Sequence, residues 1–160
     1  MPDPTAAFRD HLARALDWED AHVGFRRAVD GIPPARRGDR ARGFEHSPWE
    51  LIEHIRIAQQ DILDFCVDAN YTHAMTWPDD YWPAQPSPPS AQAWTDSVAA
   101  CTRSRDALKR IARDVDDLTA RVPAGKATQT YLRAILLAID HAAYHVGQLV
   151  AVRRALGIWT

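Results

Sequence analysis

The chain has little from which a covalent or cysteine-based framework could be built. Its 160 residues include only two cysteines, Cys66 and Cys101, which lie far apart and form no CxxC spacing. A disulfide framework or a cysteine zinc cluster is therefore not expected, and we interpret both thiols as core residues. The seven glycines form no glycine-rich phosphate loop, and no alternating apolar run predicts a β-strand of useful length.

Charge and hydropathy narrow the range of partners. Nineteen lysines and arginines stand against 21 acidic residues, which gives a net charge of −2 and no overall positive field to attract nucleic acid. No stretch approaches ~18 consecutive apolar residues, and the start, Met1-Pro2-Asp3-Pro4, lacks the basic and apolar segments of a signal peptide. We therefore expect no nucleic-acid partner, no membrane span and a cytoplasmic location. The length and the hydrophobic fraction of 46% predict a single globular domain over residues 1–160.

Apolar residues then recur at steps of three and four in four stretches, which predicts four helices. The first covers residues 5–29, with Thr5 as its cap and the sequence Gly31-Ile32-Pro33-Pro34 as its end. The second begins at Ser47-Pro48-Trp49-Glu50, where a serine cap, a proline at the first helical position and a glutamate three residues after the cap form a strong start signal.

The third helix opens at Ser90 and ends before Pro123, and the fourth is capped by Thr128 and ends before Gly157. Together these segments predict an all-α fold, an antiparallel-type four-helix bundle with long connections after the first and second helices. In such bundles, sites are built between facing helices.

The two long connections differ in composition. Residues 35–46 contain four arginines, which indicates either a solvated surface or a site for an anionic substrate. Residues 70–89 contain five prolines among four large aromatic residues. We interpret this stretch as an ordered loop packed over one end of the bundle; covering a pocket or lying at a dimer interface are the alternatives.

Three histidines stand out by their positions. His141 and His145 lie one turn apart on the last helix, where they can share one ion. His54 falls within the apolar stripe of the second helix, where a buried imidazole needs a partner. The alternative is a core histidine bonded to a backbone carbonyl or to Asp61. Three imidazoles on inward faces would suit a first-row divalent metal and leave positions open for water or substrate.

The stretches Ser47-Pro48-Trp49-Glu50-Leu51-Ile52-Glu53-His54-Ile55 and Asp140-His141-Ala142-Ala143-Tyr144-His145-Val146-Gly147-Gln148 resemble the DinB/YfiT-like superfamily of metalloenzymes. This resemblance implies a four-helix bundle, often dimeric, in which His54, His141 and His145 hold a divalent metal. Nickel or zinc is implied first, with manganese or iron as alternatives. Some members transfer low-molecular-weight thiols, so a thiol cofactor is also implied as an option.

We therefore expect a metal-dependent enzyme acting on a small molecule, either a hydrolase or a low-molecular-weight-thiol transferase. The alternatives are a non-catalytic metal- or small-ligand-binding bundle and a bundle whose histidines bind no metal. Asp61 and His22 are the candidate general bases because both lie on expected inward helical faces, and each also has a packing explanation. Asp61 could equally pair with a cationic side chain or lie near the metal.

Two further expectations concern packing and assembly. Gly147 would allow another helix to approach closely, and Gln148 would lie at the same end of its helix as His145. Leu16 and Val23 lie off the apolar stripe of the first helix, and Trp159 lies near the C-terminus. Exposed apolar groups are often covered by a partner, so we expect a homodimer, which the resemblance also implies.

Overall fold

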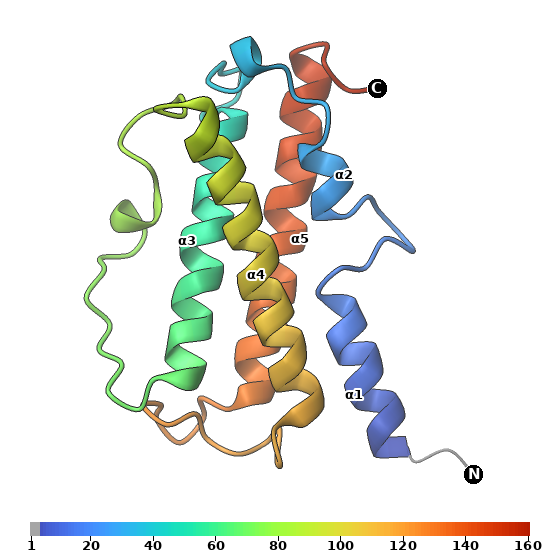
Figure 1. Ribbon diagram of the computed structural model, residues 1–160, viewed down its shortest axis with the longest axis vertical. Helices are drawn as coiled ribbons and strands as arrows, with labels where there is room; N and C mark the ends of the chain where they lie inside the picture. Colours follow the sequence, from blue (N-terminus) through green and yellow to red (C-terminus); the bar gives the residue numbers. More distant parts are fainter. Residues whose placement is uncertain (1–3) are drawn as a thin grey trace.

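The computed structural model describes residues 4–160 and is built from helices (Figure 1). Five α-helices and two single-turn 3₁₀ helices follow one another as α1 (Pro4–Ala15), α2 (Phe25–Val29), η1 (Pro34–Arg36), α3 (Pro48–Val67), η2 (Asp79–Tyr81), α4 (Ala91–Asp114) and α5 (Tyr131–Ala155). Within residues 4–160 no β-strand forms, and Arg121 and Thr130 make an isolated antiparallel bridge. The all-α expectation is confirmed. Residues 1–3, part of the start that we expected to lack a signal peptide, lie outside the described residues.

The helices do not alternate in direction along the bundle. α3 and α4 both run downward in Figure 1, whereas α1 and α5 run upward. The expected antiparallel-type arrangement is therefore wrong for the neighbours α3 and α4. Because α3 spans roughly 30 Å, the chain over residues 68–90 must return along its whole length before α4 begins. The aromatic connection accordingly lies beside α3. The expectation that it packs over one end of the bundle is wrong.

The helix expected over residues 5–29 is broken into α1 and α2. Asp17, in the break, is held by α4 instead, through Arg105 at 3.3 Å and through Lys109. The side chain of Glu19 fills the space next to Gly24, the N-cap residue of α2, where a Cβ atom would clash. Long-range ion pairs and the close approach at Gly24 thus interrupt the helix that the apolar spacing predicts. As a result α1 packs against α4, and the short α2 packs against α5.

The start of α3 is confirmed in detail. The side chain of Ser47 accepts from the backbone N–H of Glu50, and the Glu50 carboxylate accepts from the backbone N–H of Ser47 at 2.7 Å. This reciprocal pair satisfies two N–H groups at the helix start. The Ser47 hydroxyl also donates to the carbonyl of Pro86 at 2.5 Å, which fastens the far end of the aromatic connection to the same point.

Two other helix boundaries differ from expectation. α4 ends at Asp114, so that Val115 and Leu118, which belong to the same apolar period, lie in the following loop. The cap of α5 is Thr130, whose side chain accepts from Arg133 N–H, and not Thr128. The bridge between Arg121 and Thr130 holds the chain extended up to this point. At the other end, Gly157 adopts a φ of 70° and allows the chain to leave α5.

Three apolar clusters fill the described part of the bundle, and the smallest has Cys66, Val122 and Ala134 as its buried members. The first cluster joins α2, α3, the start of α4 and the C-terminal half of α5, and its buried members are Phe25, Ala28, Val29, Ile32, Trp49, Leu51, Ile52, Ile55, Trp94, Cys101, Val146, Leu149, Val150 and Val152. The second joins α1, the later part of α4 and the start of α5, with Leu12, Ala13, Leu16, Leu108, Ala112, Leu118, Ile135 and Ala138 buried. Both cysteines are buried free thiols, and burial raises the pKa of each to about 12. Their expected core role is confirmed.

The residues that suggested a homodimer pack within the chain. Leu16 is 6% exposed, and Val23 packs against the first cluster. The Arg153 guanidinium lies 4.7 Å from the centre of the Trp159 ring. These side chains therefore need no second copy to cover them, and the homodimer stays a prediction without support from this part of the fold.

α5 is a long apolar helix that contacts three other helices of the bundle. By length and composition alone it is apolar enough to cross a membrane, contrary to our expectation for the sequence, and 39% of its most apolar window is buried. It packs against α2, α3 and α4. The fully buried Arg153 near its end donates to the carbonyls of Arg27 and Ala28, which ties α2 to it. Such contacts are those of a core helix in a bundle.

Candidate metal centre

Three histidines from two helices converge between α3 and α5. His54 lies on α3, and His141 and His145 lie one turn apart on α5. One ring nitrogen from each lies within 4.8 Å of the other two, and the Nε2 atoms of His54 and His141 are 3.0 Å apart. His54 is 1% exposed and His145 is buried, while His141 is half-buried. The structure thus brings all three expected ligand residues together.

The protonation of His54 is set by a backbone carbonyl. Its Nδ1 lies 2.9 Å from the carbonyl oxygen of Tyr81. Because a carbonyl oxygen only accepts, Nδ1 carries the proton and Nε2 keeps its lone pair, which faces His141. The core-histidine alternative is therefore half correct: one nitrogen of His54 has a backbone partner, and the other, Nε2, lies 3.0 Å from the Nε2 atom of His141 within the cluster.

The side chain of Gln148 determines which ring nitrogen of His145 carries the proton, in the same way. The Nδ1 atom of His145 lies 2.7 Å from Oε1 of Gln148, and the amide nitrogen of Gln148 donates to the Tyr144 hydroxyl at 3.2 Å. With the amide oriented by Tyr144, its oxygen accepts the Nδ1 proton of His145 and leaves Nε2 unprotonated. A carbonyl partner on the outer nitrogen is a common arrangement for histidines that bind metals. Gln148 therefore lies beside His145, as its position on the helix predicted.

All three imidazoles are held in their neutral form. Burial, and after it the neighbouring imidazoles His145 and His54, lowers the pKa of His141 to about 3. Burial and then His54 lower the pKa of His145 to about 4, against the raising effect of Gln148. Burial likewise lowers the pKa of His54. Near neutral pH the cluster therefore offers lone pairs without positive charge, which is what a cation requires.

Aromatic rings of the connection over residues 68–90 cover His54. The Trp82 ring stacks on His54 with centroids 3.9 Å apart, and His46 stacks on the other face of Trp82 at 3.7 Å. Trp77 is 60% exposed and lies 5.9 Å from His54 and 6.5 Å from His141. Of the interpretations considered for this connection, covering the site is the one that the structure supports.

Asp61 does not face the cluster but fastens that connection. Its two carboxylate oxygens accept hydrogen bonds from the hydroxyls of Tyr71 at 2.7 Å and Tyr81 at 2.6 Å. Burial and these hydrogen bonds raise the pKa of both tyrosines. Asp61 therefore has neither the cationic partner that we considered nor a free oxygen directed at the histidines. It holds Tyr81, whose carbonyl in turn orients His54.

His22 is exposed, in the segment between α1 and α2, with its Nδ1 2.9 Å from the carbonyl of Val23. It lines a groove with Ala143 and Val146, in which none of the three clustered histidines takes part. Trp18 is 48% exposed in the same segment. The inward face expected for both residues is absent because the helix is broken there, and the structure does not bring His22 to the cluster.

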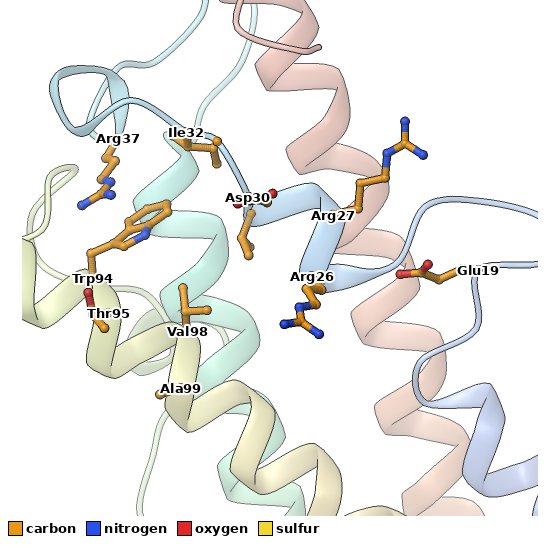
Figure 2. Close-up of a pocket in the computed structure, with 12 residues that line it drawn as sticks. Glu19, Arg26, Arg27, Asp30, Ile32, Arg37, Trp94, Thr95, Val98 and Ala99 are labelled. Atoms are coloured by element: carbon orange, nitrogen blue, oxygen red, sulfur yellow. The ribbon is translucent and has the colours of Figure 1, made fainter.

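A separate cavity lies between α2 and the first turns of α4 (Figure 2). It measures about 770 Å³, and none of the three histidines lines it. Its charges are mixed, because Arg26 and Arg37 lie there with Glu19 and Asp30. Arg37 stacks 4.3 Å from the centre of the Trp94 ring at the edge of this cavity (Figure 2).

The residues present fit a divalent cation. Each histidine offers one ligand atom. In two of the three rings the outer nitrogen, Nδ1, donates a hydrogen bond to a carbonyl oxygen, that of Tyr81 or of the Gln148 side chain. Sequence reasoning missed the parts played by Tyr81, Trp82 and His46, since they depend on where a long connection folds back. The density of aromatic residues between prolines was the one available signal that this connection is ordered.

Residues 17–149 match the protein-family model described as the DinB superfamily. No curated protein and no solved structure matches the chain.

Proposed function

The chain belongs to the DinB superfamily, and from that membership and the histidine cluster we propose that it is a metal-dependent enzyme acting on a small molecule. His54, His141 and His145 would hold the cation, with nickel or zinc as the first candidates and manganese or iron as alternatives. A bound divalent cation lowers the pKa of a coordinated water or thiol and stabilises the resulting anion. The proposed reaction is accordingly hydrolysis or the transfer of a low-molecular-weight thiol.

The observation that supports this proposal is the convergence of three neutral imidazoles, two of which, His54 and His145, already have a partner on their outer nitrogen. A structural zinc site normally has four protein ligands, whereas three histidines leave at least one position for an exchangeable group. The described residues offer no fourth cysteine, histidine or carboxylate in this group. An open position of this kind favours chemistry over a purely structural role.

The chain's own residues would prepare that position. Tyr81 and Gln148 orient two of the ligands, and the Trp82 ring excludes water from one face of His54. The exposed rings of Trp77 and Tyr144 lie at the margin of the cluster, next to His141 and His145 respectively. A small molecule reaching the cluster would therefore meet apolar surface.

One observation favours the alternative of a non-catalytic metal- or small-ligand-binding protein. Neither candidate base is free at the cluster, since Asp61 is bonded to two tyrosines and His22 lies in a different groove. On this alternative the same histidines would bind a cation for stability or sensing, without turnover.

The test compares the untagged wild type with His145→Ala and, as a matched control, His11→Ala, which alters an exposed histidine on α1. Metal content, thermal midpoint and turnover on thiol-acceptor, ester and amide substrates are measured after loading with nickel or zinc. We expect one equivalent of metal in the wild type and the control, and loss of both metal and turnover in His145→Ala with a similar midpoint for the metal-free proteins. A wild type that binds no stoichiometric cation overturns the proposal. A wild type that binds metal and shows no turnover, with a large metal-dependent midpoint, favours the alternative.

A further inference from the structure

The cavity between α2 and the first turns of α4 contains a cation that has no acidic partner. Arg37 lies half-buried at its edge, with the guanidinium carbon 4.3 Å from the centre of the Trp94 ring (Figure 2). Its Nε atom is buried without a hydrogen-bond partner, and within residues 4–160 the side chain forms no ion pair. Burial lowers the pKa of this guanidinium. A charge withdrawn from water is costly unless an opposite charge meets it.

Arg37 differs in this respect from the other three arginines of the connection over residues 30–47. Arg36 pairs with Asp39 at 2.6 Å, and Arg40 donates to Glu50 at 3.0 Å. The fourth arginine is exposed, so water solvates its charge. Among the residues that the structure describes, Arg37 is thus the arginine of this connection that is drawn out of water without a carboxylate.

The rest of the cavity is apolar, with balanced charges. Its volume of about 770 Å³ is in the range of small-molecule sites. The apolar side chains that line it are Val29, Ile32, Trp94, Val98 and Ala99. The other charged residues of the lining are Glu19, Arg26, Arg27 and Asp30, two of each sign. Because these four charges balance one another, the net charge of the lining is that of Arg37.

We propose that this cavity binds a small organic molecule with one carboxylate and an apolar body. The carboxylate would accept hydrogen bonds from the terminal nitrogens of Arg37, since a planar guanidinium suits a carboxylate. The apolar body would lie against Trp94 and Val98. A neutral molecule would leave Arg37 unpaired, and a second carboxylate would find no further net charge to meet. None of the three clustered histidines lines this cavity, so the proposal does not rest on the proposed function.

The experiment titrates the full chain with 3-phenylpropionate and follows the indole N–H signals by nuclear magnetic resonance. A chelating buffer keeps cations away from the histidine cluster. We expect one-to-one binding with a dissociation constant below about 5 mM, and the largest shift at Trp94. The neutral 3-phenylpropanamide should bind at least tenfold more weakly, because it supplies no charge to Arg37. Phenylsuccinate, which adds a second carboxylate to the same ring, should bind no more tightly than 3-phenylpropionate.

Three variants then test which residues make the contacts. Arg37→Gln removes the cation, so the carboxylate should bind no better than the amide. Thr95→Trp fills the cavity from an exposed position on α4 and should abolish binding of 3-phenylpropionate. Arg42→Gln, at the exposed arginine of the same connection, is the matched control and should leave binding unchanged. Circular dichroism confirms that each variant is folded.

A dissociation constant above about 5 mM for the wild type overturns the proposal, as does an amide that binds as tightly as the carboxylate or a phenylsuccinate that binds more tightly. So does binding that survives in folded Arg37→Gln or Thr95→Trp, or that is lost in Arg42→Gln. Largest shifts at Trp77 or Trp82 would place the ligand at the histidine cluster and would also overturn it.

Discussion

The two long connections of this fold form hydrogen bonds with different polar groups: one bonds to helix ends, and the other bonds to a buried histidine. In the connection over residues 30–47, guanidinium groups serve helix ends: Arg36 donates to the carbonyl of Leu156 at the end of α5, and Arg40 pairs with Glu50 at the start of α3. In the connection over residues 68–90, the carbonyl of Tyr81 and the ring of Trp82 serve a buried histidine. The arginine connection thus closes one end of the bundle, and the aromatic connection covers the site.

This division is close to the reverse of what composition suggests. An arginine cluster indicates a solvated surface or an anion site, and a proline-rich aromatic loop indicates a cover for one end of a bundle. The difference arises from the course of the chain, since only the connection between two parallel helices runs along their length (Figure 1). Stability should therefore depend mainly on the first connection, and metal affinity mainly on the second.

The strongest test of this division is Glu50→Ala. The Glu50 side chain is 6% exposed and accepts from Ser47 N–H and from Arg40. Its removal leaves a buried N–H without a partner and should lower the free energy of unfolding by about 3 kcal/mol. Metal affinity should stay within twofold of the wild type, as measured by titration beside urea unfolding. Glu45→Ala, at an exposed glutamate of the same connection, is the control. A large loss of metal affinity in Glu50→Ala would break the division.

The second test is the acid response of the metal-free protein. His141 and His145, with pKa values of about 3 and about 4, stay neutral in the folded chain where imidazoles of the unfolded chain already take up protons. The free energy of unfolding should therefore fall as pH drops from about 6.5 to about 4, by about 2 kcal/mol after allowing for the partial exposure of His141.

The control is the double variant His141→Gln/His145→Gln. Over the same pH range its free energy of unfolding should fall by about 2 kcal/mol less than that of the wild type. Urea unfolding in a chelating buffer at both ends of the range makes the measurement. Equal pH dependence in the two proteins would contradict the assignment of neutral histidines.

A smaller effect is expected for Asp61→Ala, which frees the hydroxyls of Tyr71 and Tyr81 and loosens the aromatic connection. Because the Tyr81 carbonyl orients His54, metal affinity should fall roughly tenfold or more, as for other residues that support metal ligands. Asp64→Ala, which removes an exposed carboxylate bonded to Gln60 on the same helix, should leave the affinity unchanged. Equal affinities for the two variants would show that the connection does not set the ligand.

The smallest effect is expected for Arg40→Gln. The Arg40 side chain is 52% exposed, so its ion pair with Glu50 is screened by water, and its loss should lower the free energy of unfolding far less than Glu50→Ala does. Metal affinity should not change. A cost equal to that of Glu50→Ala would mean that the ion pair, and not the backbone cap, stabilises the start of α3.

The features that could be predicted from the sequence are those set by neighbouring residues. The start of α3 is determined by groups three residues apart, so Ser47 and Glu50 are sufficient to locate it. The positions of His141 and His145 on one helix, and that of His54 within an apolar stripe, follow from helical period alone. These local patterns account for the three candidate ligands and for the all-α class.

The features that could not be predicted depend on contacts between distant residues. The break after α1 depends on the pairing of Asp17 with Arg105, which lies on another helix. The partner of His54 is a carbonyl 27 residues away, and no side chain marks a carbonyl in the sequence. Asp61 was expected to act as a base or to pair with a cation, and its actual partners, the hydroxyls of Tyr71 and Tyr81, become visible only once the chain has turned back along α3.

The parallel course of α3 and α4 also bears on how quickly the molecule assembles. A bundle of short hairpins forms mostly local contacts and folds in microseconds to milliseconds, whereas contacts between segments remote in sequence slow the search. Here the hydrogen bond from Ser47 to Pro86 closes a loop of 39 residues, and the contact between His54 and His141 closes one of 87. The histidine cluster should therefore form late in folding, after the helices have paired. During refolding, metal uptake should accordingly rise more slowly than the helical circular dichroism signal.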